Sequence, residues 1–164
     1  MAHFVIRARA IASLVAGAAV LAGCTAPSVP PPSASKPVLE PCVAAAAGEP
    51  LAGNWLSVRT QKGVLGELRT LFTLQADGTM AYTEQLKRPK KPSQGLDETG
   101  CWKRDGQVLT IETRHSNGVP VDASDPIYTN RYTIVSSNAR QLTLQGQDGV
   151  IKAKRMSPGY RLPF

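Results

Sequence analysis

Histidine is scarce in this chain, which contains only two among its 164 residues. His3 stands ahead of an N-terminal apolar segment, and His115 stands close to Asn117-Gly118 in a predicted turn. Glycine-rich phosphate loops and nucleotide-binding fingerprints are absent from the sequence. A Ser-His-Asp set around His115 stays an alternative, although no spacing brings such residues together. We therefore expect a binding protein rather than an enzyme, and no cofactor.

Long apolar runs are also lacking. The main apolar stretch covers residues 11–23, which is shorter than the ~20 apolar residues that span a bilayer. Arg7 and Arg9 precede it, and a basic start followed by a short apolar segment is typical of a secretory signal peptide. The stretch ends in Leu21-Ala22-Gly23-Cys24, a motif that resembles the lipobox of bacterial lipoproteins.

In lipoproteins with this motif, the Cys thiol receives a diacylglyceryl group and signal peptidase II cuts ahead of it. The resemblance implies that residues 1–23 are the signal peptide and that Cys24 carries the lipid. Two or three acyl chains such as palmitate, at roughly 0.8 kcal/mol per buried methylene, attach a protein to a membrane almost permanently. Because residue 25 is Thr and not Asp, the resemblance further implies the outer membrane, with the domain facing the periplasm.

Cysteine is scarce as well, since Cys42 and Cys101 are the only others. In the oxidising environment that the signal implies, a disulfide between them is the expected state. The chain-entropy model assigns roughly 4 kcal/mol to such a long closed loop. No histidine or third cysteine stands near either residue, so no metal site is expected.

Acidic residues are few, with 12 against 19 Lys and Arg, and the net charge of +7 falls to +5 without Arg7 and Arg9. This charge is compatible with an anionic lipid or cell-wall polymer. Basic residues interleaved with aromatic ones are missing, so no nucleic-acid partner is expected. The cations concentrate in Lys87-Arg88-Pro89-Lys90-Lys91-Pro92. A solubilising loop is the alternative to an anionic-surface site made of Lys87, Arg88, Lys90 and Lys91.

Residues 24–41 are rich in Pro and Ser and cannot form a packed core, so we expect an extended tether. Residues 42–164 then form the folded domain. Asp-Gly and Asn-Gly pairs recur in it between runs rich in Thr, Val, Leu, Ile and Tyr, which is the strongest short-range signal for hairpins. We expect eight strands, near residues 53–60, 67–75, 79–86, 100–105, 107–114, 127–136, 140–146 and 149–156.

Alternation of apolar and polar residues supports one buried face per strand. In residues 67–75, Leu68, Thr70, Phe72 and Leu74 share a face, with Leu71 as the exception on the other. Glu84 interrupts the apolar face of residues 79–86. Sequential hairpins with one apolar face favour an all-β, antiparallel up-and-down barrel of about eight strands, and an open sandwich is the alternative.

Gly53-Asn54-Trp55 opens the first strand and resembles the Gly-x-Trp start of lipocalins and their relatives. In that family the Trp packs across one end of the barrel beneath an Arg from a late strand. The resemblance implies a lipocalin-like barrel in which Arg155 covers Trp55, a cation–π contact of ~0.5–2 kcal/mol. An ordinary Arg at the barrel rim is the alternative.

The sequence thus predicts a lipid-anchored periplasmic protein that carries or senses a small apolar ligand inside a barrel. The candidate ligand-lining residues are Phe72, Met80, Tyr82, Trp102 and Tyr132. The alternative is an envelope interaction module that binds a protein or an anionic polymer through the basic loop.

Overall fold

The computed structural model describes residues 40–163. The predicted signal peptide, the lipidation site Cys24 and nearly all of the predicted tether lie outside the described residues. Within 40–163 the chain forms nine strands and a single turn of 3-10 helix, with no α-helix. No helix in this part of the chain is long and apolar enough to cross a membrane.

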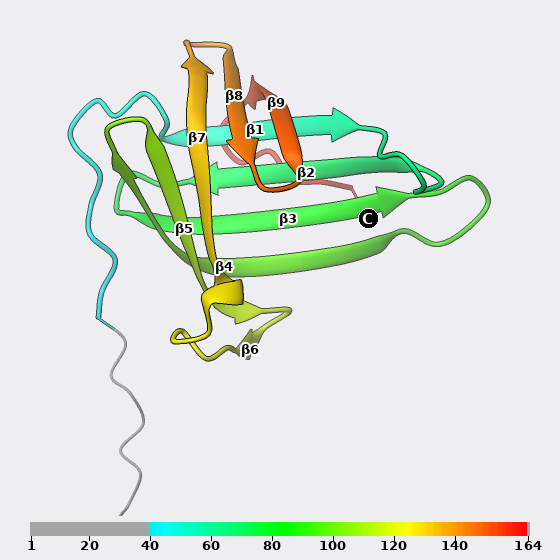
Figure 1. The fold of residues 1–164 in the computed structure, drawn as a ribbon, viewed down its shortest axis with the longest axis horizontal. Helices are drawn as coiled ribbons and strands as arrows, with labels where there is room; N and C mark the ends of the chain where they lie inside the picture. Colours follow the sequence, from blue (N-terminus) through cyan, green and yellow to red (C-terminus); the bar gives the residue numbers. More distant parts are fainter. Residues whose placement is uncertain (1–39, 164) are drawn as a thin grey trace, which may run out of the picture. The chain divides into compact units, whose positions relative to one another are not determined.

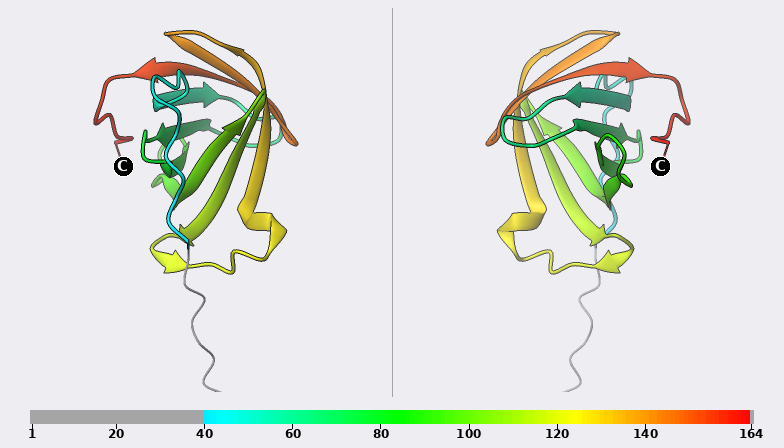
Figure 2. Two further views of the ribbon diagram at one scale, coloured as in Figure 1. Left: turned by 90° about the vertical axis from the view of Figure 1, so that its left-hand side faces the viewer. Right: turned by 90° about the vertical axis from the view of Figure 1, so that its right-hand side faces the viewer.

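Eight of the strands close into an antiparallel barrel, which confirms the predicted fold class. Each barrel strand pairs with the barrel strand that follows it in the chain, so that β5 pairs with β7, and β9 returns to pair with β1. Figures 1 and 2 show β5, β7, β8 and β9 crossing over the wall formed by β1 to β4, with β6 lying apart at the bottom. The barrel strands are β1 (Gly53–Arg59), β2 (Glu67–Leu74), β3 (Thr79–Lys87), β4 (Gln94–Asp105), β5 (Val108–Ser116), β7 (Thr129–Ser137), β8 (Gln141–Gly146) and β9 (Gly149–Met156). A two-residue strand β6 (Val119–Pro120) and the 3-10 turn η1 (Pro126–Tyr128) lie between β5 and β7.

Tight turns fix the register of these hairpins, as the Asp-Gly turn between β2 and β3 illustrates. Gly78 has a φ of 83°, and the Asp77 carboxylate accepts hydrogen bonds from the Thr79 amide at 2.9 Å and hydroxyl at 2.6 Å. A side chain at Gly78 would place its Cβ 1.9 Å from the Val43 carbonyl oxygen. Only glycine fits both the left-handed backbone and the close approach of the N-terminal segment.

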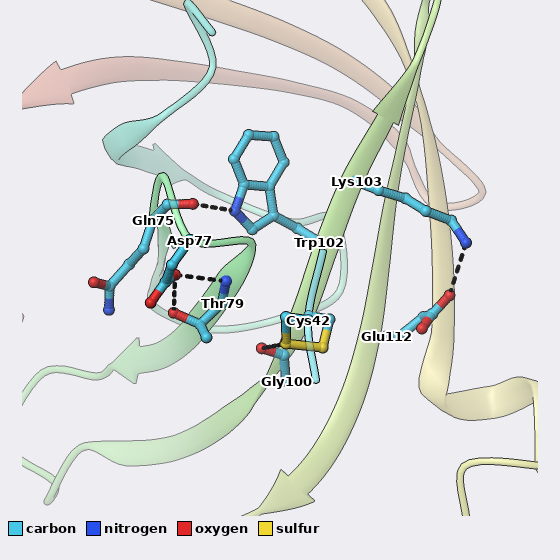
Figure 3. Close-up of a disulfide and its surroundings, with 9 residues drawn as sticks. Cys42, Gln75, Asp77, Thr79, Gly100, Trp102, Lys103 and Glu112 are labelled. Atoms are coloured by element: carbon cyan, nitrogen blue, oxygen red, sulfur yellow. Dashed lines mark hydrogen bonds and ion pairs between the residues drawn. A yellow bond between two sulfur atoms is a disulfide. The ribbon is translucent and has the colours of Figure 1, made fainter. Parts of the chain in front are cut away.

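The disulfide between Cys42 and Cys101 is present, which confirms that prediction (Figure 3). The two Cα atoms lie 5.3 Å apart, within the usual range for such a bond. The Ala45 amide also donates to the Ala76 carbonyl oxygen at 2.9 Å. The disulfide attaches the segment before β1 to β4, and the hydrogen bond attaches it to the turn between β2 and β3.

The C-terminal tail explains why Leu71 breaks the alternation of β2. Leu71 faces outward, yet its side chain is only 4% exposed. Residues 157–163 cover this outer face, where Leu162 is 5% exposed and Gln85 donates to the Pro163 carbonyl oxygen at 2.6 Å. Leu71 therefore packs in a small second cluster outside the barrel.

Strand β4 begins at Gln94, so the expectation of a strand starting near residue 100 was wrong. Its first half pairs with β3, with Gln94 opposite Leu86 and Glu98 opposite Tyr82. The sequence of this half, Gln-Gly-Leu-Asp-Glu-Thr, has little intrinsic preference for strands. Pairing with the long strand β3 overrides the local preference, and it carries Glu98 to the inner face of the barrel.

Candidate binding site at the barrel mouth

One end of the barrel is closed by Trp55, which is fully buried. Its indole nitrogen donates to the Leu51 carbonyl oxygen at 2.8 Å, and the Arg155 guanidinium carbon lies 4.0 Å from the ring centroid. This is the contact that the Gly-x-Trp resemblance implied. Arg155 also donates to the carbonyl oxygens of Ala52 at 2.8 Å and Ala139 at 2.9 Å. Arg155 thus connects the segment before β1 to the turn between β7 and β8 while it covers the indole.

The interior next to this end is filled by side chains of the protein itself. Three of the five candidate lining residues, Phe72, Met80 and Trp102, belong to the core and are 0%, 3% and 3% exposed. The other two, Tyr82 and Tyr132, pack edge-on against Phe72 with ring centroids 5.2 and 5.9 Å away. The structure therefore brings Tyr82 and Tyr132 together at the boundary between the core and the open end.

At the open end, the mouth of the barrel, lies a pocket of about 550 Å³. Tyr82 and Tyr132 belong to its walls. Strands β1 and β9 pair only at residues 54–56 of β1, so the seam between them is unpaired further toward the mouth. Arg59 from β1 and Ile151 from β9 border the pocket on the two sides of this seam. The pocket is therefore open to the outside through the mouth and its walls are drawn from β1, β3, β7 and the β8–β9 hairpin.

A network of polar side chains faces this pocket, centred on Glu84. The Tyr82 hydroxyl donates to Glu84 Oε2 at 2.7 Å, and the Thr70 hydroxyl donates to the same oxygen at 3.4 Å. Arg59 donates to Thr70 at 3.1 Å, and its other terminal nitrogen lies 4.0 Å from Glu84 Oε2. Within residues 40–163, Glu84 Oε1 accepts no hydrogen bond, so this oxygen is free to contact a ligand.

A second carboxylate, that of Glu98, also points inward. It lies on β4 opposite Tyr82 and accepts a hydrogen bond from the Thr113 hydroxyl at 3.3 Å. Burial raises the pKa of Glu98, against the hydrogen bond from Thr113, and the nearby Glu84 raises it further. The pocket itself is bordered by the acidic residues Glu84 and Asp148 and by the basic residues Arg59, Lys62 and Arg131, and Glu98 is not among its lining residues.

Both tyrosines keep their protons at neutral pH. Burial raises the pKa of Tyr132 to about 12, and the charges of Glu84 and Glu98 raise it as well. Burial, followed by the charge of Glu84, also raises the pKa of Tyr82. The site therefore offers two neutral phenols and the Glu84 carboxylate, which can accept a hydrogen bond from a ligand, while the aromatic rings can contact its apolar part.

Sequence reasoning did not select Arg59, Thr70, Glu84 or Glu98 as site residues. The available signal was a polar residue at an inward position of a strand, and Glu84 was noticed only as an interruption of the apolar pattern. Such interruptions on several strands at the same distance from the closed end mark a polar mouth.

The remaining candidates lie elsewhere. His115, near the end of β5, is half-buried opposite Pro120 of β6. Within residues 40–163 no three His, Cys, Asp or Glu side chains gather in a way that could hold a metal ion. Lys87, Lys90 and Lys91 are exposed on the β3–β4 connection, with Arg88 half-buried beside them. These cations lie at the mouth end of the barrel but are not among the pocket residues.

Comparison with known proteins gives no family: no protein-family model and no curated protein matches this chain. The barrel and the polar pocket at its mouth are thus the features from which a function can be inferred.

Proposed function

We propose that this protein binds a small molecule in the mouth of its barrel, without catalysis, while anchored to the bacterial outer membrane by lipid on Cys24. The observation that carries the binding proposal is the pocket of about 550 Å³, bordered by tyrosines and by the network centred on Glu84. A site of this size falls within the range of small-ligand pockets in proteins. The lipobox-like motif and the disulfide support an exported protein.

The ligand we propose has an apolar body and a cationic or hydrogen-bond-donating group. An apolar ligand was expected from the sequence, and Tyr82, Tyr132 and Ile151 supply surface for an apolar part. The wholly apolar region around Phe72 and Trp102, however, is occupied by packed side chains. A ligand at the mouth would also meet Glu84, so a polar group on it would replace the water that solvates this carboxylate.

Binding of matched probes tests this proposal. Octylammonium, octanol and octanoate share one apolar chain and differ in the charge of the head group. We expect octylammonium to bind most tightly in calorimetric titration, because Glu84 Oε1 is free to accept a charge-assisted hydrogen bond. Glu84→Gln should weaken octylammonium binding about tenfold and leave octanol binding unchanged.

Glu112→Gln is the matched control, since Glu112 lies on β5 away from the pocket, 3.2 Å from Lys103 Nζ. It should not alter binding of any probe. Equal binding of octylammonium by the protein and its Glu84→Gln variant, or a preference for octanoate, would contradict the proposed ligand class.

A further inference from the structure

Two loops at the mouth end form a continuous surface, which we call the basic tip: residues 60–66 between β1 and β2, and residues 87–93 from the end of β3 to β4. Register places them together, because Arg59 lies opposite Leu68 and Leu68 lies opposite Leu86. The loops also touch, since a Cβ atom at Gly66 would lie 2.6 Å from the Lys87 carbonyl oxygen. Both loops extend beyond the rest of the barrel on the right of Figure 1.

The basic tip carries only positive charge. Its sequence contains no Asp or Glu, and its five cations are Lys62, Lys87, Arg88, Lys90 and Lys91. None of the four ion pairs found within residues 40–163 uses any of them. The closest acidic residue in sequence, Glu67, pairs with Arg69 at 2.7 Å. The four lysines are exposed and are therefore available to a partner of opposite charge, whereas Arg88 is half-buried.

Apolar side chains stand exposed among these cations. Leu65 is 79% exposed and Val64 is 36% exposed, and both lie in the first loop of the tip. A single exposed leucine is ordinary on a protein surface. Here, however, the apolar pair shares the tip with four lysines, and a combination of apolar and basic side chains is typical of proteins that lie in the interface of an anionic bilayer.

We propose that the basic tip docks on the surface of an anionic lipid bilayer. The lysines contact the head-group phosphates, while Leu65 and Val64 enter the boundary between head groups and acyl chains. A dissolved anionic polymer offers the phosphate or carboxylate charge but no apolar layer for Leu65, so the lipid surface fits both observations. Docking in this way presents the mouth end of the barrel to the membrane, with Lys62 of the tip also bordering the pocket.

Position-specific fluorescence tests the proposal on the full chain. An environment-sensitive dye is attached to the thiol that Leu65→Cys introduces, in protein that also carries Cys24→Ser. The two remaining cysteines are joined in the disulfide, so the dye labels position 65. Val135→Cys is the matched control, because Val135 is 61% exposed on β7 close to the closed end. The dye at position 65, and not at position 135, should shift to the blue with vesicles containing phosphatidylglycerol. It should not do so with pure phosphatidylcholine, and the shift should decrease at high salt.

Replacing Lys62, Lys90 and Lys91 by Ser should lower the affinity of the labelled protein for these vesicles at least tenfold. Circular dichroism checks that the exposed substitutions leave the barrel folded. An unchanged affinity, an equal shift at positions 65 and 135, or no shift at either position would overturn the proposal. A shift that appears only when dextran sulfate is added would assign the tip to anionic polymers instead.

Discussion

Tyr82 and Glu84 stand two residues apart on the inner face of β3, and the phenol of Tyr82 donates to Glu84 Oε2 across 2.7 Å. Tyr82 therefore contacts both the Phe72 ring in the core and the Glu84 carboxylate at the mouth. The hydrogen bonds from Tyr82 and Thr70 engage Glu84 Oε2 and leave Oε1 without a hydrogen-bond partner among residues 40–163. Because the phenol keeps its proton at neutral pH, this relationship is stable across the physiological range.

Removal of that phenol gives the first prediction. Tyr82→Phe should destabilise the fold by about 1 kcal/mol, less than the roughly 1.5–3 kcal/mol typical of a hydrogen bond to a charged group, because Glu84 keeps its contacts with Thr70 and with water. Urea unfolding measures the change. Tyr160→Phe is the control, since Tyr160 lies in the C-terminal tail and its hydroxyl makes no hydrogen bond to another residue of 40–163. An equal loss in both variants would contradict a specific role for the Tyr82–Glu84 bond.

The closed end gives the second prediction. Arg155→Lys should lower the free energy of unfolding by about 2 kcal/mol, because an ammonium cannot cover Trp55 and also reach the carbonyl oxygens of Ala52 and Ala139. Arg140→Lys is the control at an exposed site close by. Thermal unfolding followed by tryptophan fluorescence reports both variants. A smaller loss for Arg155→Lys than for Arg140→Lys would be inconsistent with this role.

The disulfide gives the third prediction. Reduction, or joint replacement of Cys42 and Cys101 by Ser, should cost roughly 2–4 kcal/mol of stability, because it frees the segment before β1. Urea unfolding with and without dithiothreitol measures the effect. The double-Ser variant should be insensitive to the reductant. Equal midpoints for the oxidised and reduced protein would show that the remaining contacts, such as Ala45 to Ala76, hold the segment alone.

Much of the barrel was predictable because local signals agreed with the tertiary structure. Asp77-Gly78 and the other Gly-containing turns contain residues with positive φ, which is typical of tight hairpins. Because a tight turn pairs the two strands on either side of it, these turns made the order of the strands predictable. Because Cys24 was expected to carry the lipid, Cys42 and Cys101 were the only two cysteines left to form a disulfide. Trp55 and Arg155 were placed through a family resemblance, and the structure brings them into contact.

The mouth could not be predicted in the same way, because its residues come from strands whose relative register the sequence does not encode locally. Glu84 and Glu98 both disturb an apolar pattern, and they face one interior only after β3 and β4 pair along their full length. The first half of β4 has weak strand preference and was missed for that reason. The burial of Leu71 could not be predicted either, because it depends on residues 157–163, which have no regular structure and fold back over β2.

Tyr132 gives the fourth prediction, on stability at high pH. Burial raises its pKa to about 12 in the folded protein, whereas an unfolded tyrosine titrates near pH 10. Above about pH 10 the unfolded chain releases this proton while the folded chain retains it, so stability falls as the pH rises and the loss levels off above about pH 12. Tyr132→Phe removes this contribution and should make the decline shallower over that interval. Urea midpoints measured across it, with tyrosinate absorbance recorded on the same samples, test this, and parallel declines in both proteins would contradict a buried, protonated Tyr132 at the mouth.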